Sequence, residues 1–307
     1  MKHAFIMDPL DRVKPSKDTS YFLMLAAQER GHDVYHVNPS HLSIDNGRVI
    51  TKLVQVQVNQ SHLKPFVILR TGWEYLDDVD VVWIRTDPPV DRGYFYATLL
   101  LDFLPSTVRV INRPSTIRDW NEKLAALKYP DWTPSTMVAC DIESIINFSK
   151  EYKRLTIKPL DGHGGNGIIF VRSSDQDLIK KIQMATNGGK HWVIVQEYLE
   201  AAQEGDKRIL LLNGKPIGAM LRLHKEGHEL NNLDQGGTPI RSTLDSSDHN
   251  ICETLENDLR KNGVVFAGID IIGGRLIEIN ITSPTGLQEM ARFDERSYHH
   301  DVIKSLE

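Results

Sequence analysis

The pattern of apolar segments changes near Leu155, and this change sets the strongest limit on how the chain can fold. Over the first 110 residues, short apolar runs alternate with segments of helical periodicity. The runs are Ala4–Met7, Val34–Val37, Val79–Ile84 and Val108–Ile111, and the helical segments are Tyr21–Glu29 and Tyr94–Phe103. Such alternation predicts a parallel sheet that is covered by helices on both faces, as in an α/β domain.

Beyond Leu155, strand-like segments dominate, and several are joined by glycine-containing turns such as Asn213-Gly214 and Gly273-Gly274. These turns are typical of hairpins, so we expect mostly antiparallel sheets here. The expected strands are Leu155–Ile157, Gly167–Val171, Trp192–Gln196, Arg208–Leu212, Ile217–Arg222, Val264–Ile272 and Leu276–Ile281. Between the two regions we expect a linker over Asn112–Thr116 and then a helix. The expected helices are Asn121–Lys128, Asp175–Ala185 and His249–Asn262.

Length and composition limit the class of protein. A chain of 307 residues exceeds what one hydrophobic core usually holds, so two or three subdomains are expected. The net charge of −5 and the scattered basic residues give no reason to expect a nucleic acid or an acidic membrane as partner. Only Cys140 and Cys252 occur, and no apolar stretch approaches the roughly 18–20 residues that span a bilayer. We therefore expect a soluble cytoplasmic protein.

The first segment that could carry chemistry is glycine-rich and runs from Lys158 to Gly167. Its glycines let the backbone approach a ligand closely and direct N–H groups at phosphate oxygens. It is not a P-loop, because the Gly-Lys-Ser/Thr signature is missing and a strand follows instead of a helix. The glycines alone do not distinguish a flap that covers phosphates from a loose β-turn that binds no ligand. Lys158, at the end of a strand beside the loop, favours the phosphate interpretation.

The second segment, Gly268–Asn280, places polar residues inside apolar strand sequence, where an unpaired carboxylate is costly. Carboxylate and amide oxygens on adjacent strands are ligands that Mg²⁺ prefers. A three-residue loop over Gly273–Arg275 sets Asp270 opposite Glu278, with Asn280 on the same face, whereas a two-residue turn does not. The metal interpretation therefore predicts the three-residue loop. The alternative is that these carboxylates point to solvent on an edge hairpin.

Two further segments admit both a functional and a structural interpretation. Val193–Leu199 is an apolar strand that runs into polar residues, and such a segment can offer backbone groups to adenine or be core alone. Downstream, Asp206-Lys207-Arg208 could supply an acceptor for a ribose hydroxyl and a cation that faces a phosphate, but this stretch could also be a solvated turn.

Two more candidates lie earlier in the chain. Lys123 stands near the start of the expected helix and is either a second phosphate-binding cation or surface charge. Arg85 follows a buried strand of the first domain. In open α/β sheets ligands bind beyond the carboxyl ends of the strands, so Arg85 could face a substrate. The alternative is an exposed arginine before a rigid Pro-Pro turn.

The order of these motifs is more specific than any one of them. Asn-Glu-Lys is followed by Lys-Pro-Leu-Asp-Gly-x-Gly-Gly, Gln-x-Tyr-Leu, Gly-Asp-Lys-Arg, Gly-x-Asp-Ile-Ile-Gly, Glu-Ile-Asn and Thr-Ser-Pro-Thr. Met7-Asp8-Pro9, Lys17-Asp18-Thr19-Ser20 and Arg85-Thr86-Asp87-Pro88-Pro89 fit as well. Over nearly its whole length the chain resembles the bacterial glutathione synthetases, which are ATP-grasp carboxylate–amine ligases.

The resemblance implies an N-terminal parallel-sheet α/β domain followed by a two-subdomain ATP-grasp fold with antiparallel sheets, a combination of α/β and α+β. The expected boundaries are 1–120 for the N-terminal domain, 121–200 for the subdomain with the glycine-rich flap and 201–307 for the subdomain with the metal site. The resemblance also implies an enzyme that assembles as a homo-oligomer, a tetramer.

Residue by residue, the resemblance implies the following sites. ATP would be bound by Lys123, Lys158, Gly162, Gly164, Gly165, Gly167, Gln196, Glu197, Tyr198, Leu199 and Asp206. Mg²⁺, with Mn²⁺ able to substitute, would be held by Asp270, Glu278 and Asn280. The catalytic residues facing the transferring phosphoryl group would be Arg208 and Arg222, and the peptide substrate would lie near Arg85, Ser283 and Thr285.

The implied reaction joins γ-glutamylcysteine to glycine through an acylphosphate and yields glutathione, ADP and phosphate. Three positions depart from the family. Thr86 replaces a usual lysine, Leu230 in the stretch Gly227–Gly237 replaces a common arginine, and Gly286-Leu287-Gln288 replaces a segment that usually ends in arginine. All three touch the acceptor or lid region. The alternatives are therefore an ATP-grasp ligase for another acid and amine, or an ATP-binding relative without catalysis.

Overall fold

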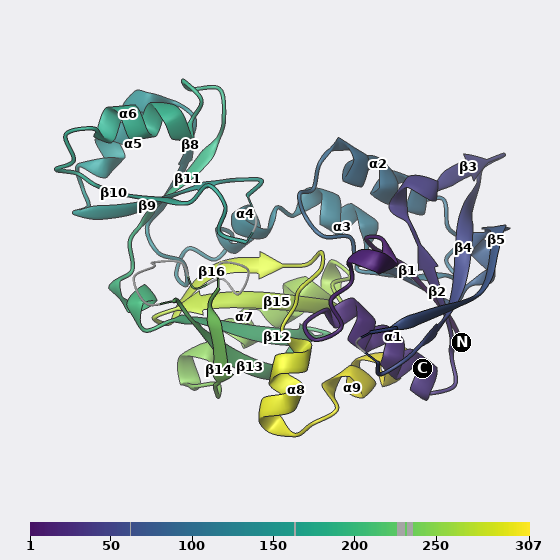
Figure 1. Cartoon of the computed structure of the whole chain (residues 1–307). Coiled ribbons are helices and arrows are strands. Elements are labelled where there is room, and N and C mark those ends of the chain that lie inside the picture. Colours follow the sequence, from purple (N-terminus) through teal and green to yellow (C-terminus); the bar gives the residue numbers. More distant parts are fainter. Residues whose placement is uncertain (62, 163, 226–230, 232–235) are drawn as a thin grey trace.

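A computed structural model describes residues 1–61, 63–162, 164–225, 231 and 236–307. Its strands form three sheets, which are separate in Figure 1. The expected position Leu230 and most of Gly227–Gly237 lie outside the described residues, as does His163 within the glycine-rich loop. In the part of the chain that is described, no helix has the length and apolar character needed to cross a membrane.

The N-terminal sheet contains the predicted parallel strands in the order β2-β1-β6-β7. Their bounds are Lys2–Ile6 for β1, Asp33–Val37 for β2, Val81–Ile84 for β6 and Arg109–Ile111 for β7. Helices α1 (Thr19–Glu29) and α9 (Tyr298–Lys304) cover the face that carries Phe5 and Trp83. Helices α2 (Arg92–Leu101) and α3 (Pro114–Asp119) cover the opposite face. Successive residues of these strands therefore point to opposite faces of the sheet and pack in two different cores.

The sheet is mixed and not wholly parallel, which corrects the sequence prediction. Strands β3 (Ser43–Asp45), β4 (Arg48–Val58) and β5 (Phe66–Tyr75) extend it with antiparallel pairs. In β4 apolar residues alternate with polar ones, which is the signal of a half-buried strand. In β5 no residue is fully buried, so its sequence shows no such alternation. The expected linker Asn112–Thr116 is also shorter than predicted, because Pro114 is the first residue of α3.

The second sheet is antiparallel, in the order β10-β9-β11-β8, and forms a lobe with its own core. Its strands are β8 (Thr136–Ala139), β9 (Arg154–Pro159), β10 (Ile169–Arg172) and β11 (Val193–Glu197), and its helices are α5 (Ile142–Ser149) and α6 (Leu178–Ala185). In Figure 1 this lobe stands apart from the rest of the chain and faces β16 across a gap that contains α4 (Glu122–Ala126). Strand β8 and helix α5 had no counterpart in the sequence prediction.

The third sheet is antiparallel in the order β14-β13-β12-β15-β16. Its strands are β12 (Asp206–Leu212), β13 (Lys215–Leu223), β14 (Thr238–Arg241), β15 (Phe266–Ile272) and β16 (Arg275–Asn280), and its helices are α7 (Ser246–Lys261) and α8 (Leu287–Asp294). Helix α7 begins three residues before the predicted start because Asp245 and Asp248 form a capping box. The two larger cores run from the N-terminal sheet into this third sheet. These two sheets therefore form one packed body.

His3 gives this body a predictable response to acid. Its ring is fully buried and is stacked on the His32 ring, with 4.9 Å between the ring centroids. Its Nδ1 accepts a hydrogen bond from Trp83 Nε1 at 3.2 Å. Burial, followed by the neighbouring His32, lowers the pKa of His3 to about 4. The unfolded chain binds a proton at this residue below about pH 6.5, whereas the folded chain does not until about pH 4. The contribution of His3 to the free energy of unfolding is therefore fully present above about pH 6.5 and is lost as the pH falls from there to about 4.

We expect lowering the pH from 7.5 to 5.0 to cost the native chain about 2 kcal/mol more unfolding free energy than it costs His3→Gln. The glutamine retains an acceptor for Trp83 but has no titrating group. Urea unfolding of both proteins at the two pH values measures the difference. Equal losses in the two proteins would assign the acid sensitivity to other groups.

Candidate active site

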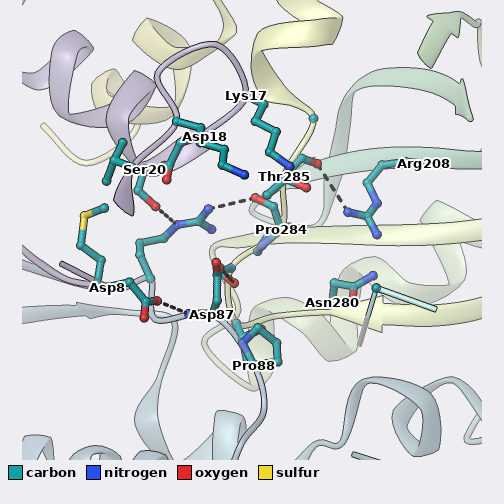
Figure 2. Close-up of a pocket in the computed structure, with 18 of the residues that line it drawn as sticks. Asp8, Lys17, Asp18, Ser20, Asp87, Pro88, Arg208, Asn280, Pro284 and Thr285 are labelled. Atoms are coloured by element: carbon teal, nitrogen blue, oxygen red, sulfur yellow. Dashed lines mark hydrogen bonds between the residues drawn. The ribbon is translucent and has the colours of Figure 1, made fainter. Parts of the chain in front are cut away.

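Two cavities lie side by side where the three sheets meet. The larger has a volume of about 470 Å³ and is enclosed by the loops that follow β1, β6 and β16 (Figure 2). The smaller lies between the second and third sheets and is lined by residues of β9, β11, β15 and the glycine-rich loop. Glu278 and Gly164 line both cavities. A molecule in one cavity would therefore meet a molecule in the other at these two residues.

The β15–β16 hairpin supplies the carboxylates at this junction. Asp270 pairs with Glu278 and Gly268 with Asn280, so the three polar side chains share one face, as predicted. The loop prediction, however, was wrong. The turn has two residues, because Ile272 pairs with Arg275, and a β-bulge at Ile277 then restores the pairing of Asp270 with Glu278. Gly273 and Gly274 have φ values of 54° and 74°, which the tight turn requires.

Two arginines from the neighbouring strands hold Asp270. Arg208 donates to both its carboxylate oxygens at 2.7 Å, and Arg222 lies 3.0 Å from one of them. Arg222 also donates to Asp206, and all four residues are buried. Burial alone would raise the pKa of Asp270, but the charges of Arg208 and Arg222 outweigh it and lower that pKa. Asp270 is thus a carboxylate at neutral pH, with two guanidinium groups facing the junction.

A second charged group lies across the junction, on α4. Lys123 Nζ donates to Glu122 Oε1 at 2.9 Å and to the carbonyl oxygen of Gly162 at 2.6 Å, and it lies 3.7 Å from Glu278 Oε1. Asn121 caps α4 with its side chain and also donates to the carbonyl of Leu160. The short helix therefore connects the glycine-rich loop to the carboxylates of β16.

The smaller cavity has the features of a nucleotide site. Lys158 is buried, and its Nζ donates to Gln196 Oε1 at 2.9 Å. Burial lowers the pKa of this lysine, so a bound anion would relieve its desolvation. Oδ1 of Asp206 is buried in the cavity wall without a hydrogen-bond partner in the described chain. An orphaned acceptor at this depth would be satisfied by a hydroxyl donor such as that of a ribose.

The other predicted nucleotide residues also line this cavity. They are Lys123, Gly162, Gly164, Gly165, Glu197, Tyr198 and Leu199; Gly167 closes the loop behind them. The loop depends on its glycines, because Gly165 and Gly167 have φ values of 83° and 76°. A Cβ on Gly162 would lie 2.5 Å from the Pro159 ring. A larger residue at Gly162 would therefore force the loop to shift.

The larger cavity contains the predicted substrate residues. Arg85 donates to Ser20 Oγ and to the carbonyl of Pro284, both at 3.0 Å, and its Nη1 is buried without a partner in the described chain. Ser283 donates to Asp87 at 2.9 Å. Thr285 lines the same wall, and its carbonyl oxygen lies 3.5 Å from Arg208.

Comparisons with known proteins match both halves of the chain. Residues 1–118 match the N-terminal domain of prokaryotic glutathione synthetase, and residues 122–295 match the ATP-grasp domain of the same enzyme. The chain belongs to the prokaryotic glutathione synthetase family. It is 40% identical to the glutathione synthetase of Gloeobacter violaceus, over 100% of this chain and 96% of the relative. It is 34% identical to that of Brucella melitensis, over 96% and 94% of the two chains.

Solved structures support the fold. The D-cycloserine synthetase DcsG matches with a TM-score of 0.67 at 14% identity, over 100% of both chains. A RimK domain ATP-grasp protein from Sphaerobacter thermophilus matches with a TM-score of 0.64 at 18% identity, over 99% of this chain and 98% of that chain. Membership in the glutathione synthetase family makes this chain an ATP-dependent carboxylate–amine ligase that uses a divalent metal ion.

The residues present fit the ATP and metal ion that a glutathione synthetase requires. The nucleotide cavity has the orphaned Asp206 oxygen and the buried Lys158, and the junction has carboxylate and amide oxygens on one face of a hairpin. Oxygen donors suit a hard divalent cation. Asp270 is bound by two arginines, whereas Glu278 is partly accessible and borders both cavities. Glu278 is thus the carboxylate most open to a metal ion.

Sequence reasoning did not single out three acidic residues that line the larger cavity. Glu122 projects from α4 into the junction, where burial and then the charge of Glu278 raise its pKa. Asp87 and Asp8 line the larger cavity, and the Asp87 backbone N–H donates to Asp8 at 3.0 Å. The Asn-Glu-Lys and Arg-Thr-Asp-Pro-Pro motifs contained the signal for Glu122 and Asp87. A glutamate in the first turn of a helix, however, has an ordinary explanation in the helix dipole.

Two of the positions that depart from the family pattern are placed by the structure. Gln288 is buried, and its side-chain nitrogen donates to the carbonyls of Asp18 at 2.6 Å and Pro15 at 3.3 Å. It therefore anchors the loop that forms one wall of the larger cavity. Thr86 contacts the carbonyl of Ile6 at 3.5 Å and faces away from that cavity.

Proposed function

We propose that this chain joins the cysteinyl carboxylate of γ-glutamylcysteine to the amine of glycine and produces glutathione, ADP and phosphate. The observation that carries the proposal is the meeting of two cavities at Glu278. One cavity has the cations and the orphaned acceptor that suit a nucleotide. The other has charges of both signs, which suit an amino-acid-like substrate. Phosphoryl transfer between two bound molecules requires this adjacency.

In this proposal Lys123 and Lys158 bind ATP phosphates, Asp206 binds the ribose, and residues 196–199 bind the adenine. Asp270, Glu278 and Asn280 hold Mg²⁺, which Mn²⁺ can replace. The bound metal supplies positive charge that neutralises phosphate oxygens. Gly162–Gly167 closes over the phosphates and excludes water that would hydrolyse a reactive intermediate.

The reaction has two steps. A carboxylate oxygen of the peptide attacks the γ-phosphorus, the bond from that phosphorus to the β,γ-bridging oxygen breaks, and ADP leaves. The ammonium group of glycine first loses one proton, and the free amine attacks the acylphosphate carbonyl. Phosphate departs with the bonding electrons, and the nitrogen loses a second proton to solvent or to a nearby base, which leaves the N–H of the amide. Arg208 and Arg222 stabilise the negative charge on the transferring group, because their guanidinium groups face the junction.

The larger cavity supports the choice of peptide substrate. γ-Glutamylcysteine carries an ammonium group and two carboxylates. Asp8, Asp18 and Asp87 line one side of the cavity, while the unpartnered Nη1 of Arg85 is a donor suited to a carboxylate. Burial raises the pKa of Asp87, so a bound ammonium group would favour its charged form.

Assembly into a homo-oligomer, a tetramer by family resemblance, belongs to the same proposal. The edge strand β5 exposes Ile68, Leu69 and Trp73, and an exposed apolar edge of this kind is suited to burial against another chain.

The test of the function is phosphate release from Mg-ATP with γ-glutamylcysteine and glycine, each omitted in turn. We expect release to require both substrates and glutathione to form in equal amount. Release with another acid–amine pair, but not with this one, would favour a ligase of different specificity. ATP binding without release for any pair would favour a non-catalytic relative.

A further inference from the structure

A cluster of two histidines and one glutamate lies outside both cavities, where the end of α1 meets the start of α9. Glu29 is the last residue of α1, and His299 and His300 belong to the first turn of α9. One ligand atom from each of the three side chains lies within 4.8 Å of the other two. His300 Nε2 is 3.0 Å from a Glu29 carboxylate oxygen. The packing of α1 on α9 thus brings residues 270 positions apart into one group.

His299 provides an independent observation. The residue is more than nine-tenths buried, and its Nδ1 has no hydrogen-bond partner in the described chain. The ring is stacked on the Phe22 ring, with 3.7 Å between the ring centroids, and this contact restricts its orientation. A buried ring nitrogen without a partner among the described residues is a candidate ligand for a metal ion.

We propose that Glu29, His299 and His300 form a binding site for a divalent transition metal ion of the Zn²⁺ type. Two imidazole nitrogens and one carboxylate oxygen are a common zinc donor set, and the fourth position is then taken by water. Donors that surround one tetrahedral zinc ion lie about 3.5 Å apart, so atoms that now lie within 4.8 Å of one another would have to move closer by up to about 1.5 Å. The site differs from the junction of the two cavities, where only oxygen donors are present among the predicted ligands.

The surroundings permit access and do not present free positive charge. Glu29 and His299 line an open groove between α1 and α8. The two arginines of this groove are engaged with acidic partners: Arg296 lies 2.9 Å from Asp301 and Arg292 lies 3.4 Å from Glu289. A cation can therefore reach the cluster from solvent.

A metal ion at this site would connect α9, near the C-terminal end of the described chain, to α1. Because α9 packs on the core below the N-terminal sheet, the ion would stabilise the folded state and not the catalytic groups. Its effect would be on thermal stability, with the substrate dependence of activity unchanged.

The experiment is titration of the full chain with Zn²⁺ by calorimetry, and with Co²⁺ by absorption spectroscopy, in excess Mg²⁺ to occupy oxygen-donor sites. We expect one ion per chain, a rise in Tm with Zn²⁺ that EDTA reverses, and visible Co²⁺ bands of imidazole coordination. Glu29→Gln and His300→Gln should each weaken binding about tenfold or more while leaving ATP turnover in Mg²⁺ unchanged. His249→Gln and Glu253→Gln, at exposed positions of α7, are the matched controls.

Both ligand variants change the exposed or half-buried members of the cluster, so the Phe22–His299 packing is kept and folding can be verified by circular dichroism. Zn²⁺ affinity that is the same in these variants as in the controls would place the ion elsewhere and overturn the proposal. Absence of stoichiometric binding to the native chain would overturn it as well, and would leave the Glu29–His300 pair as a hydrogen bond alone.

Discussion

Glu278→Gln should reduce ADP formation by about 10³-fold or more, with both substrates and Mg²⁺ at saturating concentrations. The substitution preserves the size of the side chain and removes only its charge. Glu278 borders both cavities and lies 3.7 Å from Lys123, so the charge is lost where metal, nucleotide phosphates and acceptor would meet. A loss of several kcal/mol of transition-state stabilisation is the expected size for a weakened metal ligand.

The measurement is ADP formation in a coupled assay, together with ATP affinity measured by calorimetry at several Mg²⁺ concentrations. If Glu278 acts through the metal, the apparent Mg²⁺ requirement rises along with the loss of turnover. Glu253→Gln makes the same chemical change on the exposed face of α7 and should leave turnover unchanged. Full activity of Glu278→Gln at ordinary Mg²⁺ would remove this residue from the metal site.

The sequence predicted the shared face of Asp270, Glu278 and Asn280, but through the wrong backbone. With a two-residue turn and regular pairing, Asp270 would lie opposite Ile277. One additional residue is needed to bring Glu278 opposite Asp270, and the prediction placed it in a three-residue loop. The chain places it in a bulge at Ile277 and closes the hairpin with two glycines. A loop and a bulge change the strand register by the same amount, so residue spacing alone cannot distinguish them.

The antiparallel extension of the first sheet was missed for another reason. Strand β5 has no fully buried residue and pairs along its length with β4. Because periodicity reports burial, a strand exposed on both faces leaves little trace in the sequence.

The parts of the site that depend on tertiary contacts could not be predicted from local patterns. Glu122 becomes a site residue only because α4 packs against β16. The cluster at Glu29 likewise needs α1 and α9 to meet, which no local pattern in either helix predicts.

The second large effect is expected for Arg208→Lys, which should lower kcat by about 10²-fold or more while changing the affinity for ADP little. Arg208 makes a two-pronged pair with Asp270, and its Nη1 extends toward Thr285 in the acceptor cavity (Figure 2). A lysine retains the positive charge but has a single ammonium group. It cannot hold Asp270 and face a transferring phosphoryl group at the same time.

Steady-state kinetics with each substrate varied, and calorimetric titration with Mg-ADP, separate this role from a structural one. Loss of the two-pronged pair should also lower Tm, because Asp270 is buried and retains only Arg222 as a guanidinium partner. Lys207→Arg, at the adjacent position on the other face of β12, is a matched exchange of the same two residue types outside the cavities. A large fall in Tm with kcat preserved would make Arg208 a structural partner of Asp270. A fall in kcat with ADP binding preserved would place its guanidinium group at the reacting phosphoryl.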